Sequence, residues 1–261
     1  MGYYVTLAPG IPITNSLNWN LGMASPSLPP LHPAFSYRVD HVGREQQPVV
    51  VIDNFLGDPD SLVDYCATTA RFNAERGFYP GMRFPAPGLY VEALSRHLGE
   101  LVYDVFELPR GIRRKVRSAF SIVVTPPEQL LPEQSAPHSD STRMTDLASV
   151  HYLCDAGQGG TSLYRHRATG FEYVDERRLD EYKSVIARQV QAPDFPTGYM
   201  NGSNHLFEQI ASYDAVFNRM VIYRSTSLHA GNIGADFRFD PNPRTGRLTV
   251  NTFIYTPKDA L

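Results

Sequence analysis

The sequence predicts a protein of the α+β class, made mainly of β-structure, with helices near the N-terminus that support an antiparallel β core. Two observations predict this architecture. Apolar residues follow helical spacing in two segments before residue 108, and from about residue 115 the apolar period changes to two, which is typical of strands. Helices that come first, followed by many short strands, indicate an antiparallel core rather than alternating parallel units.

Two supporting helices are expected in the first half of the chain. The first begins at Asp58-Pro59-Asp60, where an acidic cap is followed by a proline in the first turn. Apolar residues keep helical spacing after it, at Leu62, Val63, Cys66 and Ala70. The second helix covers roughly residues 89–107, and its inner face is formed by Leu94, Leu98, Leu101, Val102 and Val105.

Strands are expected from short β-branched or alternating runs. Residues 48–53 form the first of these runs, and the others cover residues 118–124, 148–153, 161–166, 171–174, 220–223 and 248–255. A helix near 177–190 and a loop that reaches about residue 216 interrupt them. The chain is expected to form a single domain over residues 1–261. Its expected parts are a proline-rich arm (1–47), a helical support (48–115) and the β core (116–256).

The composition excludes several classes of partner. A net charge of −3 in 261 residues gives no sign of a nucleic-acid or membrane-surface partner. The chain contains no apolar run of membrane-spanning length and no secretory signal at its start, so a cytoplasmic location is expected. Two cysteines, Cys66 and Cys154, are too few for a disulfide framework and are expected to be buried. The oligomeric state is left open.

Three residues offer the ligand set of a non-haem iron site. His138 and Asp140 are two residues apart, so both side chains leave an extended segment on the same side. A second imidazole, His229, lies 91 residues beyond His138. Two imidazoles and one carboxylate are a standard set for Fe(II) in oxygenases. The pattern His-x-Asp alone carries little weight in a chain with 8 histidines and 27 acidic residues.

The surrounding motifs make the metal prediction more specific. The segment Ser149 to Cys154, the turn and strand Gly159 to Tyr164, and Thr245 to Phe253 follow the candidate ligands in a fixed order. This layout resembles the prolyl-4-hydroxylase-like branch of the 2-oxoglutarate/Fe(II) dioxygenase superfamily. The opening Val49 to Leu56 and the segment Tyr79 to Arg83 are similar to one small-molecule hydroxylase-like family in that branch. The resemblance covers about residues 48–256 and implies a double-stranded β-helix (a jelly-roll or cupin-like core).

The resemblance implies Fe(II) as the metal, held by His138, Asp140 and His229, with 2-oxoglutarate and O₂ as co-substrates. In the superfamily an arginine binds the distal carboxylate of 2-oxoglutarate, and a planar guanidinium suits this task. Arg247 keeps the family's local strand pattern, although it lies 18 residues beyond His229, which is farther than usual. An insertion at residues 236–243 explains the difference, while Arg238 and Arg244 remain rivals.

Further residues receive expected roles from their strand positions and the resemblance. Residues 249, 251 and 253 share a strand face with Arg247, so Thr249 and Asn251 are expected in the co-substrate pocket and Phe253 at the substrate. Tyr152 matches a position whose phenol often bonds the same carboxylate.

Arg83 is expected to be held in a Gly/Pro-rich loop and to bind a carboxylate of the substrate. Weaker candidates for the same role are Arg143, Arg165 and Arg167. For Phe253 and Tyr152, plain core packing is the alternative, and for the arginines it is a solvated surface charge.

The sequence thus predicts an oxygenase that hydroxylates a small, carboxylate-bearing, amino-acid-like metabolite. An alternative with the same chemistry is a peptidyl or prolyl hydroxylase. An alternative of another class is a non-catalytic β-helix protein that binds a ligand or a partner.

Overall fold

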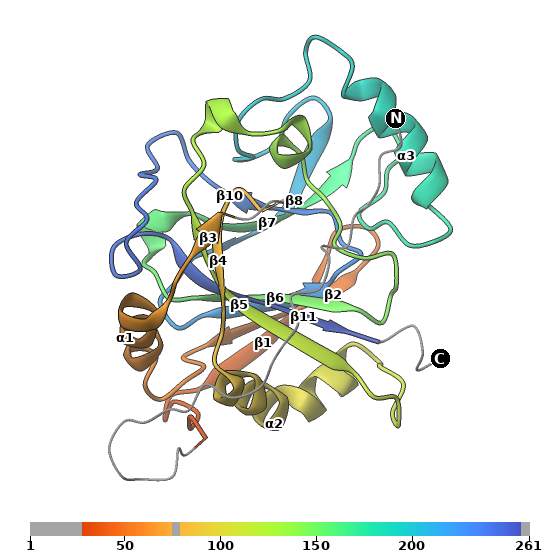
Figure 1. The fold of residues 1–261 in the computed structure, drawn as a ribbon. Coiled ribbons are helices and arrows are strands. Elements are labelled where there is room, and N and C mark those ends of the chain that lie inside the picture. Colours follow the sequence, from red (N-terminus) through yellow and green to blue (C-terminus); the bar gives the residue numbers. More distant parts are fainter. Residues whose placement is uncertain (1–27, 75–78, 257–261) are drawn as a thin grey trace.

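Two antiparallel sheets face each other in the computed structural model, which describes residues 28–74 and 79–256 (Figure 1). The major sheet has eight strands in the order β1-β2-β9-β6-β11-β5-β4-β3, and the minor sheet has three in the order β10-β7-β8. This arrangement is the expected double-stranded β-helix. The strands of the major sheet, in spatial order, are β1 (Ser36–Val42), β2 (Gln47–Asp53), β9 (Met220–Arg224), β6 (Leu147–Tyr152), β11 (Leu248–Tyr255), β5 (Lys115–Val123), β4 (Gly81–Pro85) and β3 (Asn73–Ala74). Those of the minor sheet are β10 (His229–Asn232), β7 (Gly160–His166) and β8 (Phe207–Asp214).

The outer face of the major sheet packs against the expected helices, α1 (Asp60–Thr69) and α2 (Gly88–Val105). Side chains at alternate strand positions, such as Ile222, Val250 and Phe120, join Leu94 and Leu98 of α2 in one fully or almost fully buried cluster. Each such side chain contributes about 1.5–3 kcal/mol by leaving water. The helices therefore cover the outer face of the major sheet, and its inner face borders the space between the two sheets.

That inner face is lined by the opposite set of side chains. Val221, Tyr223, Val150 and Tyr152 cluster there with Leu163 of the minor sheet. The Tyr152 hydroxyl donates a hydrogen bond of 2.6 Å to Thr161 Oγ1 of β7, so it connects the two sheets directly.

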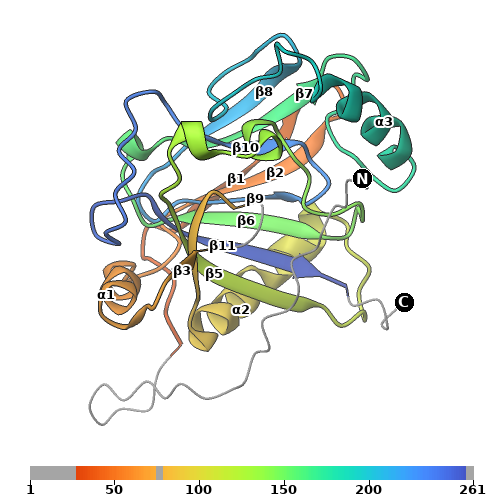
Figure 2. The ribbon, with the colours of Figure 1, turned by 45° about the horizontal axis from the view of Figure 1, so that its top comes forward.

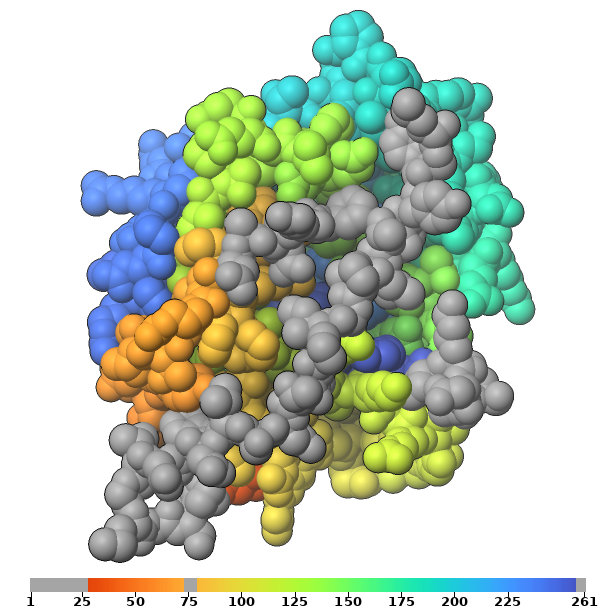
Figure 3. Space-filling model, in the orientation of Figure 1, coloured from red at the N-terminus to blue at the C-terminus, as the bar shows by residue number. Residues whose placement is uncertain are grey.

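The minor sheet is covered on its outer side by α3 (Leu179–Gln189) and the chain around it (Figure 2). Tyr164 and Phe207 of this sheet form a buried cluster with Val174, and Tyr182 and Ile186 of α3 pack against it. Short 3₁₀ helices lie in the connections: η1 (Pro127–Gln129), η2 (Pro132–Ser135) and η3 (Ala156–Gln158). In the space-filling view, the η1–η2 segment adjoins the β3–β4 hairpin (Figure 3).

Five strands of the described residues are not among the runs expected from the sequence, and two of them, β3 and β10, are only two and four residues long. Residues 36–42 form β1 rather than part of an arm, residues 81–85 form β4 rather than a loop, and residues 207–214 form β8 rather than a loop. β1 and β8 are edge strands with many polar, partly exposed side chains, so they lack apolar alternation. Hydrogen bonds to a neighbouring strand, rather than burial, define such strands.

One expected strand is wrong, because residues 171–174 form only an isolated bridge between Tyr173 and Ser227. The start of α1 agrees with the prediction, since Asp58 Oδ1 accepts the N–H of Ser61 at 3.2 Å.

Cys66 and Cys154 are buried free thiols, and burial raises their pKa values to about 12 and about 11. Residues 1–27 of the expected arm lie outside the described residues. Within the described part, no helix is long and apolar enough to cross a membrane.

Candidate metal centre

The three predicted ligands lie together at the start of β10. One ligand atom from each of His138, Asp140 and His229 lies within 4.8 Å of the other two. His138 Nε2 is 3.6 Å from Asp140 Oδ1, and His229 Nε2 is 3.3 Å from Asp140 Oδ2. The structure thus brings together residues that are up to 91 positions apart in the chain.

Main-chain hydrogen bonds hold the cluster in place. His138 and His229 exchange both N–H···O=C bonds, each 2.9 Å long, as an antiparallel bridge. The Asp140 N–H donates to the Ser225 carbonyl at 2.7 Å. The extended backbone between residues 138 and 140 then directs both side chains toward His229, as the spacing of two predicts.

The donor chemistry of the cluster fits a divalent metal. His229 Nδ1 lies 3.0 Å from the Ser227 carbonyl oxygen, which can only accept, so Nδ1 carries a proton and Nε2 is the nitrogen that faces Asp140 and is available to a metal. The His229 side chain is 8% exposed and that of His138 is 43% exposed, so the cluster is accessible from one side. Two nitrogens and one carboxylate on one face suit Fe(II) and leave positions for other ligands.

The charges of the cluster depend on one another. Burial raises the pKa of Asp140, but the two imidazoles outweigh this effect and hold that pKa well below its usual range. Burial and the neighbouring His229 lower the pKa of His138. Burial also lowers the pKa of His229, but Asp140 outweighs it, so the net pKa is raised. Asp140 is therefore ionised near neutral pH, as a metal ligand must be.

Arg247 is the one buried arginine among the three rivals. Its residue is 4% exposed, Nε donates to the Gln158 carbonyl at 3.0 Å, and Nη2 donates to the Gly160 carbonyl at 2.8 Å. Among the described residues, no carboxylate lies within 4.0 Å of its guanidinium in an ion pair. Arg238 and Arg244 are exposed, and Arg244 pairs with Asp64 on α1. The geometry favours Arg247 as the partner of a buried ligand carboxylate.

The expected co-substrate residues lie next to Arg247. Thr249 is in register with Tyr152 across β11 and β6, and its hydroxyl donates to Asn251 Oδ1 at 2.9 Å on the same face. The Arg247 guanidinium carbon is 5.7 Å from the centroid of the Tyr152 ring. Because the Tyr152 hydroxyl already bonds Thr161, its proton is engaged within the protein.

Arg83 lies on β4 and not, as expected, in a loop. β4 pairs with β5 so that Arg83 is opposite Ser121, and Ser121 is opposite Thr249 on the next strand. Its side chain therefore shares the inner face. The guanidinium carbon lies 4.4 Å from the Tyr79 ring centroid and 5.9 Å from that of Phe253, so the structure brings the two predicted substrate residues together.

The glycine of this segment permits the arrangement. A Cβ at Gly81 would lie 2.0 Å from the Ile122 carbonyl oxygen and 2.9 Å from Cε1 of Tyr79. Only glycine lets the strand approach β5 while the Tyr79 ring folds over it. The weaker arginine candidates are engaged elsewhere: Arg165 with Glu172 and Glu208, Arg167 with the Asn204 carbonyl, and Arg143 with the Thr256 carbonyl.

Two aromatic residues of the site were not singled out from the sequence. The Tyr223 ring on β9 is 4.7 Å, centroid to centroid, from the His229 ring. Burial raises the pKa of Tyr223 and the Asp140 charge raises it further, whereas Arg247 lowers it. Burial raises the pKa of Tyr79, and Arg247 and Arg83 both lower it. Tyrosines on strands are common, so nothing in the sequence distinguishes Tyr223. Tyr79 precedes β4 in a segment that contributes to the resemblance, but no role was assigned to it there.

Comparisons with solved structures give distant similarities. HygX from Streptomyces hygroscopicus with iron bound is 12% identical, with a TM-score of 0.48 over 83% of this chain and 87% of that one. The non-haem alpha-ketoglutarate-dependent carbocyclase SnoK from nogalamycin biosynthesis is also 12% identical, with a TM-score of 0.46 over 80% and 79%. An N-substituted L-amino acid dioxygenase from Burkholderia ambifaria AMMD is 12% identical, with a TM-score of 0.35 over 82% and 85%. These values are too low for the activities of those proteins to be carried over.

No curated protein matches the chain. One family model does match, over residues 33–254, which includes both sheets, the three clustered ligands and Arg247. The match extends over most of the 261 residues. The chain therefore belongs to the family described as a family of unknown function (DUF6445).

Proposed function

We propose that the protein is an Fe(II)/2-oxoglutarate-dependent oxygenase that hydroxylates a small, carboxylate-bearing molecule. One observation carries the proposal. A cluster of two imidazoles and one carboxylate shares the space between the sheets with a buried arginine that has no carboxylate partner among the described residues. A buried guanidinium without such a partner is costly unless a ligand supplies the anion. The ligand set and the arginine together suit a metal-chelating dicarboxylate.

His138, Asp140 and His229 would hold the metal. When bound with 2-oxoglutarate and O₂, Fe(II) supplies the oxidation of 2-oxoglutarate to succinate and carbon dioxide, with the second oxygen atom inserted into a C–H bond of the substrate. The residues of the protein bind and orient the metal, the co-substrate and the substrate. Arg247, fixed by the carbonyls of Gln158 and Gly160, has further N–H donors that would bind the distal carboxylate of the co-substrate.

The position of Arg83 supports a substrate that carries a carboxylate. Its guanidinium lies over the Tyr79 ring and near that of Phe253, on the inner face that also carries Thr249. We assign it to an anionic group of the substrate, with Phe253 and Tyr79 against the apolar part. A planar cation between two rings suits a carboxylate carried on a small organic body.

The test is a pair of measurements on the purified protein. Titration calorimetry with Mn(II) measures metal binding, and addition of 2-oxoglutarate afterwards measures co-substrate binding. Metal-dependent release of succinate from 2-oxoglutarate, scanned against carboxylate-bearing metabolites and short peptides with Fe(II) and ascorbate, measures turnover. If the protein binds neither ligand, the non-catalytic β-helix alternative replaces the proposal. If only peptides stimulate succinate release, the peptidyl hydroxylase alternative replaces the small-molecule substrate.

A further inference from the structure

All three candidate ligands depend on one stretch of main chain, residues 225–229. His229 is its last residue, and His138 is bonded to it through the reciprocal 2.9 Å pair. The Ser225 carbonyl accepts the N–H of Asp140, and the Ser227 carbonyl accepts Nδ1–H of His229. The position of this segment therefore sets the mutual separation of the ligand atoms.

Several stretches of main chain hold this segment: Tyr164 of β7 donates its N–H to the Leu228 carbonyl, the Asp146 carbonyl accepts the Ser225 N–H, and residues 172–174 bond its centre. The Leu228 N–H donates to the Glu172 carbonyl at 2.9 Å, and the Val174 N–H donates to the Thr226 carbonyl at 2.8 Å. These bonds flank the bridge between Tyr173 and Ser227. Residues 172–174 form no regular strand, so something else must fix them.

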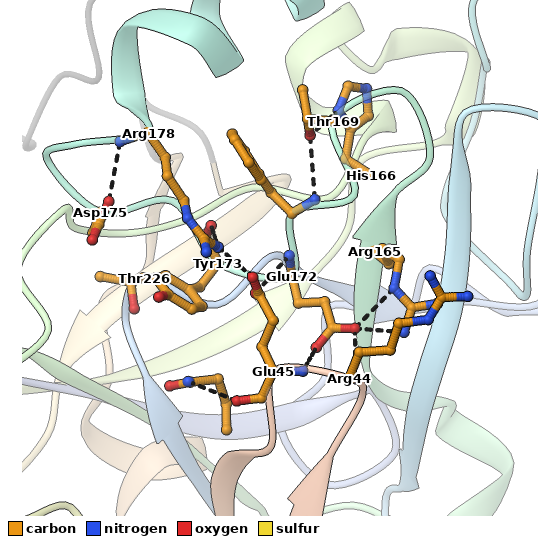
Figure 4. Close-up of polar contacts among 12 residues, drawn as sticks. Arg44, Glu45, Arg165, His166, Thr169, Glu172, Tyr173, Asp175, Arg178 and Thr226 are labelled. Carbon is orange, nitrogen blue, oxygen red and sulfur yellow. Dashed lines mark hydrogen bonds and ion pairs between the residues drawn. The ribbon is translucent and has the colours of Figure 1, made fainter.

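The Glu172 side chain supplies this fixation (Figure 4). Its carboxylate accepts the main-chain N–H groups of Arg44 and Glu45, both at 2.9 Å, in the turn between β1 and β2. The same carboxylate accepts Arg165 Nε at 2.8 Å. The side chains of Glu172 and Arg165 are 2% and 9% exposed, so this is a buried charge pair with its remaining lone pairs satisfied.

The turn is shaped for this carboxylate. Gly43 has φ +68°, and a Cβ there would lie 2.1 Å from Glu172 Oε2. Glu45 closes the arrangement from the other side, since its Oε2 accepts the Glu172 N–H at 3.1 Å and its Oε1 pairs with Arg178 Nη1 at 2.6 Å. Both the side chain and the main chain of Glu172 are thus tied to the β1–β2 turn.

We propose that Glu172 is a positioning residue of the metal centre, which fixes the ligand-bearing residues 225–229 from the β1–β2 turn. The inference rests on the proposed function, because it concerns the same three ligands. Glu172 touches none of them, so its removal should leave the ligand set intact but less well arranged. The expected effect is weaker metal binding by a folded protein, rather than loss of the site.

The experiment compares the unaltered protein with Glu172→Gln and Glu45→Gln. Mn(II) affinity is measured by titration calorimetry without co-substrate, and folding is checked by circular dichroism and the thermal midpoint. Changes to residues that support metal ligands typically weaken metal affinity ~10–100-fold. For Glu172→Gln we expect Mn(II) affinity to fall about tenfold. The milder Glu45→Gln should fall between that variant and the unaltered protein, and it carries the test if Glu172→Gln does not fold.

The matched control is Glu208→Gln. Glu208 accepts Arg165 Nη1 at 2.7 Å and is 39% exposed, so this change removes another carboxylate from the same arginine without touching residues 172–174. The control should keep the affinity of the unaltered protein. Folded Glu172→Gln and Glu45→Gln variants with unchanged Mn(II) affinity would overturn this inference alone, even if their thermal midpoints fell. An unaltered protein that binds no Mn(II) would overturn the proposed function, and this inference with it.

Discussion

The guanidinium of Arg83 lies over the ring of Tyr79, with its central carbon 4.4 Å from the ring centroid. Gly81 lies between the two residues in the chain, and it has no Cβ that would meet the Ile122 carbonyl oxygen of β5 and the Tyr79 ring. This contact holds a flexible cation before any ligand arrives, which lowers the ordering cost of binding an anion.

Replacement of Arg83 by alanine should therefore lower the substrate-stimulated rate of turnover and leave the substrate-independent rate almost unchanged. We expect substrate-stimulated succinate release to fall at least tenfold, while substrate-independent decay of 2-oxoglutarate stays within about twofold, since removal of one partner of a charged contact costs ~2–5 kcal/mol. Both rates are measured on the same preparation. If both rates fell together, Arg83 would contribute to the co-substrate pocket or to the stability of β4. If neither rate changed, Arg83 would be a surface charge.

Replacement of any one ligand by alanine, His138→Ala, Asp140→Ala or His229→Ala, should abolish tight metal binding with the fold retained. Loss of a residue that binds the metal directly should cost more than the ~10–100-fold typical of residues that hydrogen-bond the ligands. Calorimetric titration with Mn(II) checks this, with His205→Ala, a half-exposed imidazole that is near Asp194, as the control. Near-normal metal affinity in His229→Ala would remove the ligand assignment.

Replacement of Arg247 by alanine should raise the concentration of 2-oxoglutarate needed for half-maximal turnover by roughly 30-fold or more, because truncation of one partner in a buried charge pair costs ~2–5 kcal/mol. The exposed arginines of the same region provide the controls Arg238→Ala and Arg244→Ala. If a control shows the loss and Arg247→Ala does not, the co-substrate arginine has been assigned to the wrong residue.

His151 gives the protein a dependence of stability on pH that has no connection with the metal. Its imidazole lies on the outer face of the major sheet between the Tyr90 hydroxyl at 3.2 Å and Asn218 Oδ1 at 3.1 Å, and burial lowers its pKa to about 4. The unfolded chain has a pKa of about 6.5 there and so binds the proton first as pH falls. The stabilisation by the neutral ring is complete above about pH 6.5 and is lost toward pH 4, by up to about 3 kcal/mol.

Urea unfolding at a series of pH values between 4 and 7 measures this effect. A His151→Gln variant should be less stable at neutral pH, because it disturbs both hydrogen bonds, but its free energy of unfolding should fall less steeply with decreasing pH. Identical slopes for the two proteins would show that His151 does not titrate in this range.

The sequence predicted the interior of this fold better than its edges. The limits of β11 agree with the prediction residue for residue, and β5, β6, β7 and β9 agree within a few residues, because each lies within a sheet and carries an apolar pattern imposed by burial. β1 and β8 lie at sheet edges, where half of the strand faces water and the pattern fades. β4 contains Gly81 and Pro85, which are typical of loops, although here the glycine serves close approach to β5.

The residues of the site also include some that the sequence predicted and some that it did not. His138, Asp140, His229 and Arg247 were predicted because the motifs around them follow the order of a known superfamily, and the structure brings the three ligands together and buries the arginine. Tyr223 and Glu172 were not, because their importance arises from contacts with residues far away in the chain. The hydrogen bond from Tyr152 to Thr161 also depends on the distance between the two sheets, which no local pattern encodes.

The burial of Arg247 has a consequence for the lifetime of the protein. A cation enclosed beside main-chain carbonyls, with no carboxylate partner in the described part of the chain, disfavours the ligand-free fold. A dicarboxylate that binds only the folded state stabilises it by mass action, by ~2.7 kcal/mol at a concentration of about 100 times its Kd. The folded fraction, and with it resistance to proteolysis, should then rise and fall with the supply of that metabolite.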